Sequence, residues 1–292
     1  MKKTIVYILA TDFAGSHYLS LMLGSHSRVR HLGEVKRLGT RRGSRRIQWV
    51  CSACQTKGAC PILGGIGPHN VDSLYDIIFS RVDPQVEVLV DNSKLIQGWV
   101  TRFMDQGKYD LKFIHLIRDP RALVRRWLLE APGIKRGLRQ VRRFARITSA
   151  HPELAGPILR GGKTVLLTYN WLEQNQRITN FLAQHQFDTH RLTYYDLCHD
   201  TPGELTRVMK WLGLDYEPGQ PEYWNFEHHG SQKPSYDWNL EKKTTFFDVR
   251  WQTFLTPAVI QQISHDPFVQ QYLQEIGIQF REDGLTRQPV KS

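Results

Sequence analysis

Short runs of apolar residues recur along this 292-residue chain and alternate with longer stretches in which apolar residues follow a helical period. The runs are rich in β-branched residues, which is typical of strands buried on both faces of a parallel sheet. They predict strands over residues 4–10, 86–90, 112–117, 163–168 and 190–194. The helical pattern predicts helices over residues 16–24, 71–82, 94–106, 119–130, 134–149, 169–186, 202–212 and 257–275.

This alternation predicts an α/β fold with a parallel sheet flanked by helices. We expect one domain over residues 1–285 and a C-terminal tail over residues 286–292, because no repeat or low-complexity linker divides the chain. Residues 28–70 are rich in glycine, arginine and cysteine, and we expect them to form an insertion over the active edge of the sheet. Ligands of parallel sheets bind beyond the carboxyl ends of the strands. Three segments would gather there, at residues 11–16, 91–94 and 118–121.

The segment from Thr4 to Leu23 predicts a strand, a turn of small residues and a helix. Gly15 lets the backbone approach a ligand closely, and Ser16 offers a hydroxyl and the unpaired amides of a helix N-terminus, which favour anions. The turn is not a Walker A loop, because Gly15-Ser16-His17 contains no lysine. A tight strand-to-helix connection without a ligand is the alternative interpretation.

Positive charge is concentrated in two parts of the chain, which carries a formal net charge of +11. Residues 28–46 contain a run of lysines and arginines with a single acid, Glu34. Residues 121–146 contain four arginines that would share one face of a helix, namely Arg139, Arg142, Arg143 and Arg146. The clusters favour an anionic partner such as a nucleotide, an acidic glycan, a lipid head group or a nucleic acid, although a solvated surface is the usual role of such runs. The sequence contains no recognisable nucleic-acid-binding module.

Six segments, in order, carry a resemblance that spans most of the chain: "DFAGSHYLSLMLGSH", "HLGEV", "VDNSK", "LIRDPRALVRRW", "LTYYDLCHDTPGELTRVMKWLGL", and "HHGSQKPS" followed by "VRWQTFL". Together they resemble the sulfotransferases that use 3'-phosphoadenosine 5'-phosphosulfate (PAPS), especially the bacterial and carbohydrate sulfotransferase-like branch. The resemblance implies a P-loop-like, sulfotransferase-type fold. It also implies transfer of a sulfuryl group from PAPS to a hydroxyl or amine of a glycan, glycolipid or small molecule, with 3',5'-ADP as product.

The resemblance further implies which residues bind the donor. The first segment would hold the 5'-phosphosulfate and the fourth would bind the 3'-phosphate through its arginine. The residues expected to bind PAPS are Ala14, Gly15, Ser16, His17, Tyr18, Arg118, Arg126 and Lys233, with Lys94 supporting the acceptor or a phosphate. Taken without the resemblance, Arg118 could equally form a salt bridge at the start of a helix.

Sulfuryl transfer resembles phosphoryl transfer, in which the protein mainly positions the reactants and neutralises charge. The reaction needs a base to take the proton of the acceptor. By resemblance, Glu34 is the leading candidate for this base, and an ion-pair role within the insertion is its alternative. His17 could be the base or a donor to the phosphosulfate, or it could only make a hydrogen bond at the helix start.

Two positions depart from the family pattern. Phe13 stands three residues before Ser16, where the family usually places lysine or arginine to grip the phosphosulfate. Arg126 stands eight residues after Arg118, where the family usually has serine. A second guanidinium can also bind phosphate, so we expect Arg126 to contribute. Charge near the phosphosulfate would then come from other cations, with Lys94, Lys233 and the arginines of the insertion as candidates.

Cys51, Cys54 and Cys60 form a compact cluster. Three thiols so close, in a chain without a secretory signal, favour a zinc site over disulfides. Zinc would need a fourth ligand, for which the candidates are His31, His69 and Cys198. One disulfide with a spare thiol, or three free thiols, are the alternatives.

No apolar run approaches the roughly 18 to 20 residues that are needed to cross a bilayer. The N-terminal "MKKTIVYILA" imitates the beginning of a secretory signal, but the run stops before Asp12 without a small-residue cleavage site, so we expect a cytoplasmic protein. Two other functions stay open. One is a nucleotide kinase on a related fold, for which Asp91 is the partial candidate for a magnesium-binding acid. The other is a non-catalytic protein that binds PAPS or acidic polymers.

Overall fold

The computed structural model describes residues 2–39, 41–42, 45–46, 49–56, 59–104, 106–129, 133–232 and 247–289. Its strands are β1 (Thr4–Leu9), β2 (Val29–Gly33), β3 (Arg41–Arg42), β4 (Arg45–Arg46), β5 (Val50–Cys51), β6 (Val88–Asp91), β7 (Asp110–Ile117), β8 (Thr189–Thr193), β9 (Ser231–Gln232), β10 (Ile278–Phe280) and β11 (Leu285–Arg287). Its α-helices are α1 (Ser16–Leu23), α2 (Lys36–Gly39), α3 (Leu74–Phe79), α4 (Thr101–Met104), α5 (Pro120–Leu128), α6 (Ile134–Ala150), α7 (Ala155–Gln184), α8 (Tyr194–His199), α9 (Thr201–Leu212), α10 (Trp251–Phe254), α11 (Pro257–Ser264) and α12 (Pro267–Glu275). Short 3-10 or π turns are Val71–Ser73, Ile96–Val100, Pro152–Leu154 and Tyr223–Asn225.

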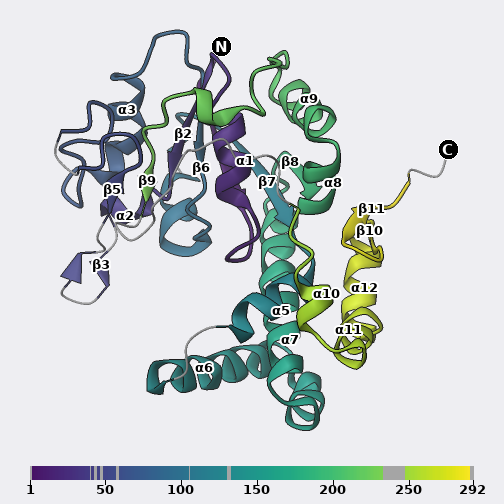
Figure 1. The fold of residues 1–292 in the computed structure, drawn as a ribbon. Coiled ribbons are helices and arrows are strands. Elements are labelled where there is room, and N and C mark those ends of the chain that lie inside the picture. Colours follow the sequence, from purple (N-terminus) through teal and green to yellow (C-terminus); the bar gives the residue numbers. More distant parts are fainter. Residues whose placement is uncertain are drawn as a thin grey trace.

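Seven strands form the main sheet in the order β5-β9-β2-β6-β1-β7-β8 (Figure 1). Every pairing within it is parallel except that between β5 and β9, which is antiparallel. The strand β1 lies between β6 and β7. The predicted α/β fold with a parallel sheet flanked by helices is therefore confirmed. Two further antiparallel pairs, β3 with β4 and β10 with β11, lie outside this sheet.

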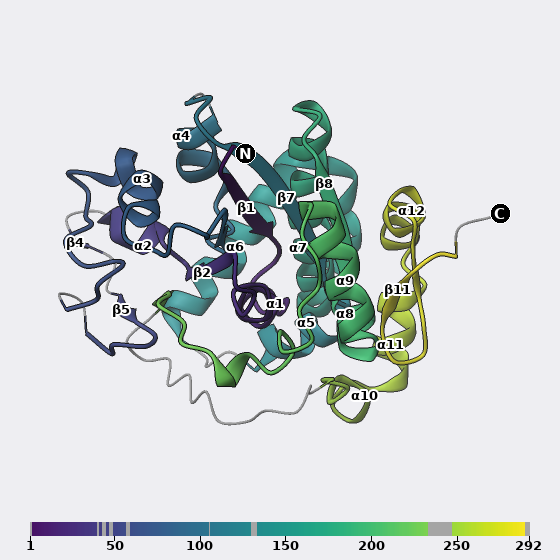
Figure 2. The ribbon, with the colours of Figure 1, turned by 90° about the horizontal axis from the view of Figure 1, so that it is seen from above.

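Helices cover both faces of the sheet (Figure 2). Along β1, Ile5 and Tyr7 belong to one hydrophobic core, which includes residues of α3, α4 and α7. Val6 and Ile8 point into a second core, which includes residues of α1, α8 and α9. A strand that is buried on both sides needs apolar residues at every position, which explains the continuous apolar run of β1.

One predicted strand is wrong. Residues 163–168, "KTVLLT", lie inside α7 and not in the sheet. Val165, Leu166 and Leu167 are all buried in a third core among α5, α7, α10, α11 and α12. A helix that is enclosed on several sides loses its amphipathic pattern, so a short apolar run within it cannot be distinguished from a buried strand by periodicity alone. The non-helical Gly162, just before the run, adds to the resemblance to a strand start.

The segment expected to form an insertion contributes to the sheet. Within residues 28–70, β2 pairs with β6 in parallel, and the short β5 pairs with β9. Further along, the helix expected over residues 257–275 is two helices, α11 and α12, because Pro267 begins the second one. The expected tail begins within β11, which pairs with β10.

The four arginines predicted to share one face of α6, in the second basic region, do not all lie on one exposed face of the helix. Arg139 and Arg142 of α6 are exposed, whereas Arg143 is buried with its guanidinium 5.6 Å from the ring centroid of Trp127. Arg146 pairs with Glu173 at 2.9 Å. Part of this charge therefore fixes α6 to the body of the protein.

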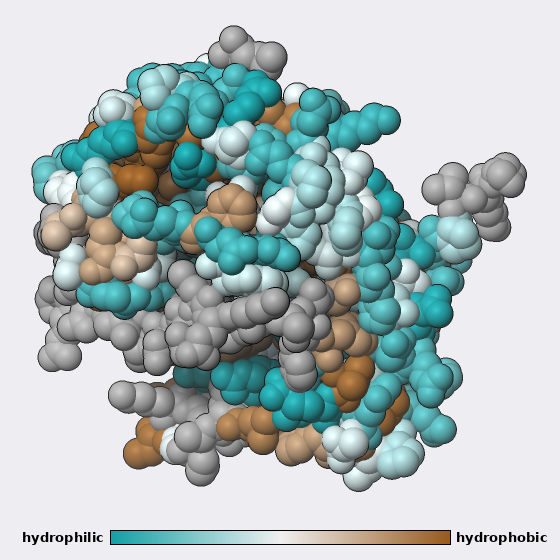
Figure 3. Space-filling model, turned by 45° about the horizontal axis from the view of Figure 1, so that its top comes forward, coloured by the Kyte–Doolittle hydropathy of each residue, from teal (hydrophilic) through white to brown (hydrophobic). Residues whose placement is uncertain are grey.

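Hydrophilic residues cover much of the face that is in view in Figure 3, and hydrophobic residues appear there as separate patches. In the described part of the chain, no helix is both long enough and apolar enough to cross a membrane.

Candidate active site

Residues that follow β1, β2, β6, β7 and β8 line one cavity of about 280 Å³. Its size lies near the lower end of small-molecule sites, roughly 300 to 1,000 Å³. Residues that the sequence predicts for the site and that line this cavity are Gly15, Ser16, His17, Tyr18, Glu34, Lys94, Arg118 and Arg126. Ala14 is fully buried within the same loop, and Lys233 lies outside the described residues.

Cations outnumber acids in the lining of the cavity. The basic residues are Arg37, Lys94, Arg118, Arg126 and Arg250, and the acids are Glu34 and Asp248. Charges of one sign that converge in a cleft with low-dielectric walls attract ligands of the opposite sign. The cavity is therefore suited to a ligand with several negative charges.

The loop between β1 and α1 is held in an uncommon backbone conformation. Phe13 has a φ angle of 70° and Gly15 a φ angle of 97°. A Cβ atom at Gly15 would lie 2.6 Å from Cδ2 of Tyr194, so only glycine fits there. Because α1 begins at Ser16, its N-terminus, where the helix dipole favours an anion, lies at the cavity.

Arg118 joins three parts of the site. Its Nη1 donates to the carbonyl oxygen of Phe13 at 2.9 Å, and its Nη2 donates to Asp248 Oδ2 at 3.0 Å. Its guanidinium lies 4.3 Å from the ring centroid of Tyr194. The neighbouring Asp119 instead caps α5 and pairs with Arg121. Arg118 is thus aimed at the β1–α1 loop and not at the acid next to it.

The side chain of Arg126 lies over Phe13, one of the two positions that depart from the sulfotransferase pattern. Its guanidinium is 4.4 Å from the ring centroid of Phe13, which is a cation–π distance. A side chain on α5 therefore places positive charge beside the loop position where the family usually has lysine or arginine. The two departures, Phe13 and Arg126, are neighbours in space.

Glu34 lies between two cations. It pairs with Arg37 and with Lys94, whose Nζ is 3.5 Å from Oε1. Burial alone would raise the pKa of Glu34, but the charges of Lys94, Lys36 and Arg37 outweigh it and lower the pKa to about 2. Lys94 itself has a φ angle of 58°, so it is held in the left-handed region at the end of β6. The carboxylate is ionised and organises these cations.

His17 lines the cavity one residue after the start of α1. Burial and, to a smaller extent, the charge of Lys94 lower its pKa, and although Glu34 opposes them the pKa falls to about 3. Its Nδ1 lies 3.4 Å from Nδ2 of Asn92, and its ring meets the ring of His31 edge to face with centroids 4.9 Å apart. At neutral pH, His17 is therefore an uncharged imidazole beside the β1–α1 loop.

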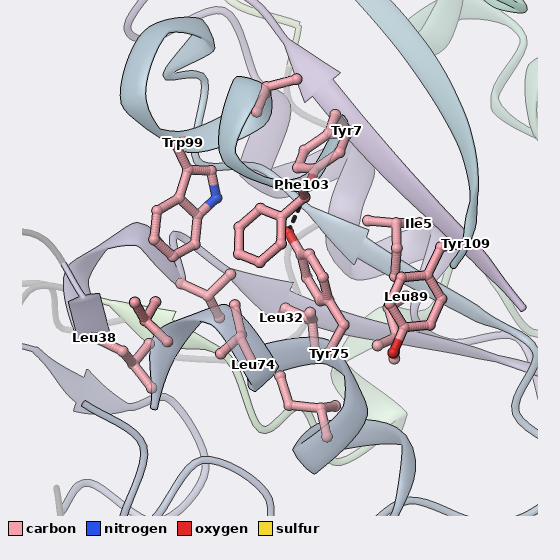
Figure 4. Packing of buried hydrophobic residues seen from close by; sticks show 14 of the residues in the cluster. Ile5, Tyr7, Leu32, Leu38, Leu74, Tyr75, Leu89, Trp99, Phe103 and Tyr109 are labelled. Atoms are coloured by element: carbon pink, nitrogen blue, oxygen red, sulfur yellow. Dashed lines mark hydrogen bonds between the residues drawn. The ribbon is translucent and has the colours of Figure 1, made fainter. Parts of the chain in front are cut away.

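Asp91, the magnesium-binding candidate of the kinase alternative, is fully buried and its oxygens are occupied. It accepts hydrogen bonds from Tyr75 Oη at 2.8 Å, Trp99 Nε1 at 2.7 Å and the backbone N–H of Ser93 at 2.7 Å. Figure 4 shows Tyr75 and Trp99 in the core and the 3.0 Å hydrogen bond between the hydroxyls of Tyr75 and Tyr7. Asp91 fixes the end of β6, and it does not line the cavity.

The three clustered cysteines come together with a histidine that the sequence interpretation did not consider. Cys51, Cys54 and Cys60 meet His229, with all four ligand atoms within 4.8 Å of one another. The proposed fourth ligands are elsewhere. His31 bonds to Ser20, His69 is exposed, and Cys198 lies on α8. The only earlier signal for His229 was its place in the closing segment "HHGSQKPS".

Several cavity residues were not predicted individually. They are Arg37, Ala122, Leu123, Tyr194, Ser231, Gln232, Asp248 and Arg250. Tyr194 belongs to "LTYYDL", Ser231, Gln232 and Arg250 come from the closing segments, and Asp248 directly precedes "VRWQTFL". The motifs thus contained most of the signal, but a linear sequence does not show which of their residues reach the cavity.

The fold is similar to that of two solved sulfotransferase domains. The sulfotransferase domain from the curacin biosynthetic pathway matches with a TM-score of 0.57 and 16% identity, over 94% of this chain and 97% of that chain. The sulfotransferase domain of the olefin synthase from Synechococcus PCC 7002 matches with a TM-score of 0.53 and 16% identity, over 95% of this chain and 96% of that chain. Searches of family models and of curated proteins found no match. This likeness extends over nearly the whole chain and shows a sulfotransferase-type fold.

Proposed function

We propose that this protein is a PAPS-dependent sulfotransferase, which moves a sulfuryl group to a hydroxyl or amine of an acceptor such as a glycan, a glycolipid or a small molecule. One observation carries the proposal: the cavity gathers the β1–α1 loop, Lys94 and the pair Arg118 and Arg126, which come from three separate motifs that are far apart in the sequence. The sulfotransferase-type fold supports the same assignment.

The residues of the cavity fit a donor of this chemistry. Arg118 Nε and Ser231 Oγ are buried and have no hydrogen-bond partner among the described residues, although both side chains line the cavity. Buried donors of this kind are costly unless a ligand satisfies them. Gly15 and Ser16, at the start of α1, would hold the 5'-phosphosulfate, and Arg118 with Arg126 would hold the 3'-phosphate.

The positive lining has a second role beyond binding. When bound, PAPS supplies an activated sulfuryl group whose transfer leaves negative charge on the departing phosphate. Lys94 would stabilise that charge, and Glu34 keeps Lys94 and Arg37 in position through its two ion pairs.

His17 is the base that the geometry favours. Glu34 would have to give up two ion pairs, with Arg37 and Lys94, to accept a proton. His17 is already neutral, and the negative charge of a bound donor would raise its pKa from about 3 towards the working range. We therefore assign the proton transfer to His17 and an ion-pair role to Glu34.

Replacement of His17 by glutamine tests this assignment. We expect kcat to fall by about 10²- to 10⁴-fold, the usual contribution of a general base, with the affinity for 3',5'-ADP changed only slightly. Glu34→Gln is the matched variant, and we expect it to weaken nucleotide binding more than it lowers kcat at saturating donor. The opposite pattern in the two variants would make Glu34 the base.

The function is tested by transfer of labelled sulfate from PAPS to a panel of glycans, glycolipids and phenols, without added magnesium. We expect labelled product and an equal amount of 3',5'-ADP, and we expect 3',5'-ADP to raise the melting temperature by mass action. If ATP with magnesium raises the melting temperature and 3',5'-ADP does not, the protein is a nucleotide kinase. Binding of PAPS without transfer to any acceptor would favour the non-catalytic alternative.

A further inference from the structure

Four side chains with metal-binding atoms meet at the outer edge of the sheet. Cys51 is in β5, Cys54 and Cys60 follow it, and His229 lies two residues before β9. Cys51 and Cys60 are buried, and none of the three cysteines forms a disulfide. Among the described residues, these four form the one group of at least three such side chains.

The spacing of the four ligand atoms matches tetrahedral zinc. The Nδ1 atom of His229 lies 3.5 Å from Sγ of Cys51, 3.4 Å from Sγ of Cys54 and 3.7 Å from Sγ of Cys60. Tetrahedral zinc with Zn–S of about 2.3 Å and Zn–N of about 2.0 Å places a sulfur and a nitrogen ligand roughly 3.5 Å apart. Three thiolates and one imidazole are also a usual ligand set of closed structural zinc sites.

The surroundings of the cluster orient its ligands as metal sites require. The other ring nitrogen of His229, Nε2, lies 3.2 Å from Oε1 of Glu227. The backbone N–H of Leu63 donates to Sγ of Cys60 at 3.2 Å. A carboxylate behind a histidine ligand fixes its tautomer, and an N–H donor to a thiolate offsets its charge.

The same cluster lies directly beside one wall of the cavity. Cys51 pairs with Ser231 across β5 and β9, which lie side by side in Figure 1. Next to this pair, the N–H of Ser52 donates to the carbonyl oxygen of Gly230 at 2.8 Å. The N–H of Glu34 donates to the carbonyl oxygen of Ser231 at 2.9 Å. Backbone hydrogen bonds thus connect the cysteine cluster through β9 to the backbone of Glu34.

We propose that Cys51, Cys54, Cys60 and His229 bind one structural Zn²⁺ ion, and that this ion fixes β9 as a wall of the nucleotide cavity. Binding replaces the protons of the three thiols, which pass to solvent, and involves no change of oxidation state. The zinc site stands on the cluster alone, whereas its effect on nucleotide binding rests on the proposed function. Among the described residues, β5 and β9 pair over two residues, so the zinc ion would add a cross-link to a short ladder.

Metal content measures the site directly. The full chain is purified without chelators or added metal, and elemental analysis is expected to find about one zinc per chain. His229→Ala should lower that content at least about tenfold at a fixed competing chelator concentration, and His69→Ala, which changes an exposed histidine outside the cluster, should not. Substitution of cobalt should give the visible and thiolate charge-transfer absorption of tetrahedral Co²⁺, and Cys54→Ser should abolish it.

Thiol counting and nucleotide titration complete the test. Denaturation in chelator should release four free thiols per chain, one for each cysteine. Folded protein that contains no zinc when it is purified without chelators, or a disulfide within the cluster, would overturn the site. Removal of zinc should weaken 3',5'-ADP binding about tenfold or more; equal binding with and without zinc would overturn the bracing role alone. Zinc at full occupancy in a protein that binds no 3',5'-ADP would leave the metal site standing and refute the proposed function.

Discussion

The centre of the sheet and its outer edge are built in different ways. At the centre, β1, β6 and β7 are parallel strands buried on both faces, and a single turn leads from β1 to the start of α1. At the edge, β9 and β5 contribute two residues each, and the four residues of the proposed zinc site come from distant segments. Burial of apolar side chains on both faces stabilises the central strands. The short strands at the edge would instead be held by a cross-link, the proposed zinc ion.

Removal of metal should separate the two regions most strongly. After chelation, we expect the amides of Ser52 and Glu34, both bonded across to the β9 segment, to lose at least about 100-fold of their protection from hydrogen exchange. Amides of β1 and β7 should keep theirs. Exchange mass spectrometry on zinc-loaded and chelated protein measures both sets at once. Uniform loss across the sheet would contradict the division into two regions.

Acid should act on the centre instead. Burial lowers the pKa of His115 in β7 to about 3, with the charge of Arg191 adding to the effect, and its Nε2 lies 3.2 Å from Asn175 Oδ1. Between the unfolded pKa of about 6.5 and this value, the unfolded chain binds a proton that the folded chain does not. Stability should therefore fall by about 3 kcal/mol from pH 6.5 to pH 4 through this residue.

The variant His115→Gln keeps a polar side chain at this buried position and removes the group that binds a proton when the chain unfolds. Urea unfolding at both pH values should show a smaller acid loss in this variant, by about 2 to 3 kcal/mol, than in the wild type. The exposed His265→Gln serves as the matched control and should lose as much stability as the wild type. An unchanged acid loss in His115→Gln would show that other groups set the acid sensitivity.

Phe13 and Arg126 provide a smaller test within the centre. Arg126→Ser, which restores the usual family residue, should weaken 3',5'-ADP binding by about 1 to 2 kcal/mol. Adding Phe13→Lys should recover part of this loss, although Phe13→Lys alone should gain little because Arg126 already supplies charge there. Calorimetric titration of the four proteins gives the coupling between the two positions. Additive effects would mean that the two residues do not substitute for each other.

The sequence predicted the centre better than the edge for a physical reason. The apolar run of β1 and the Gly15-Ser16 turn are local patterns, and the carboxyl ends of neighbouring parallel strands had to meet. His229 is 178 residues from Cys51, so no spacing rule connects the two. The contact between Arg126 and Phe13 likewise joins two segments that only the folded chain brings together. The strand predicted over residues 163–168 is wrong because a buried helix and a buried strand have the same apolar composition.

The 3'-phosphate contact of Arg118 is the central claim about the site, and a titration of two nucleotides tests it most directly. Wild type, Arg118→Ala and Arg118→Lys are each checked for folding and titrated calorimetrically with 3',5'-ADP and with 5'-AMP, which lacks the 3'-phosphate. Asp248→Asn, which removes the ion-pair partner but leaves Arg118, is the matched control.

We expect Arg118→Ala to weaken 3',5'-ADP binding by about 2 to 4 kcal/mol and to change 5'-AMP binding far less. Lysine lacks the bidentate fork, so Arg118→Lys should recover only part of the loss, and Asp248→Asn should not weaken 3',5'-ADP. Equal losses for the two nucleotides in Arg118→Ala, matched by Asp248→Asn, would make Arg118 a structural ion-pair partner and contradict the sulfotransferase assignment.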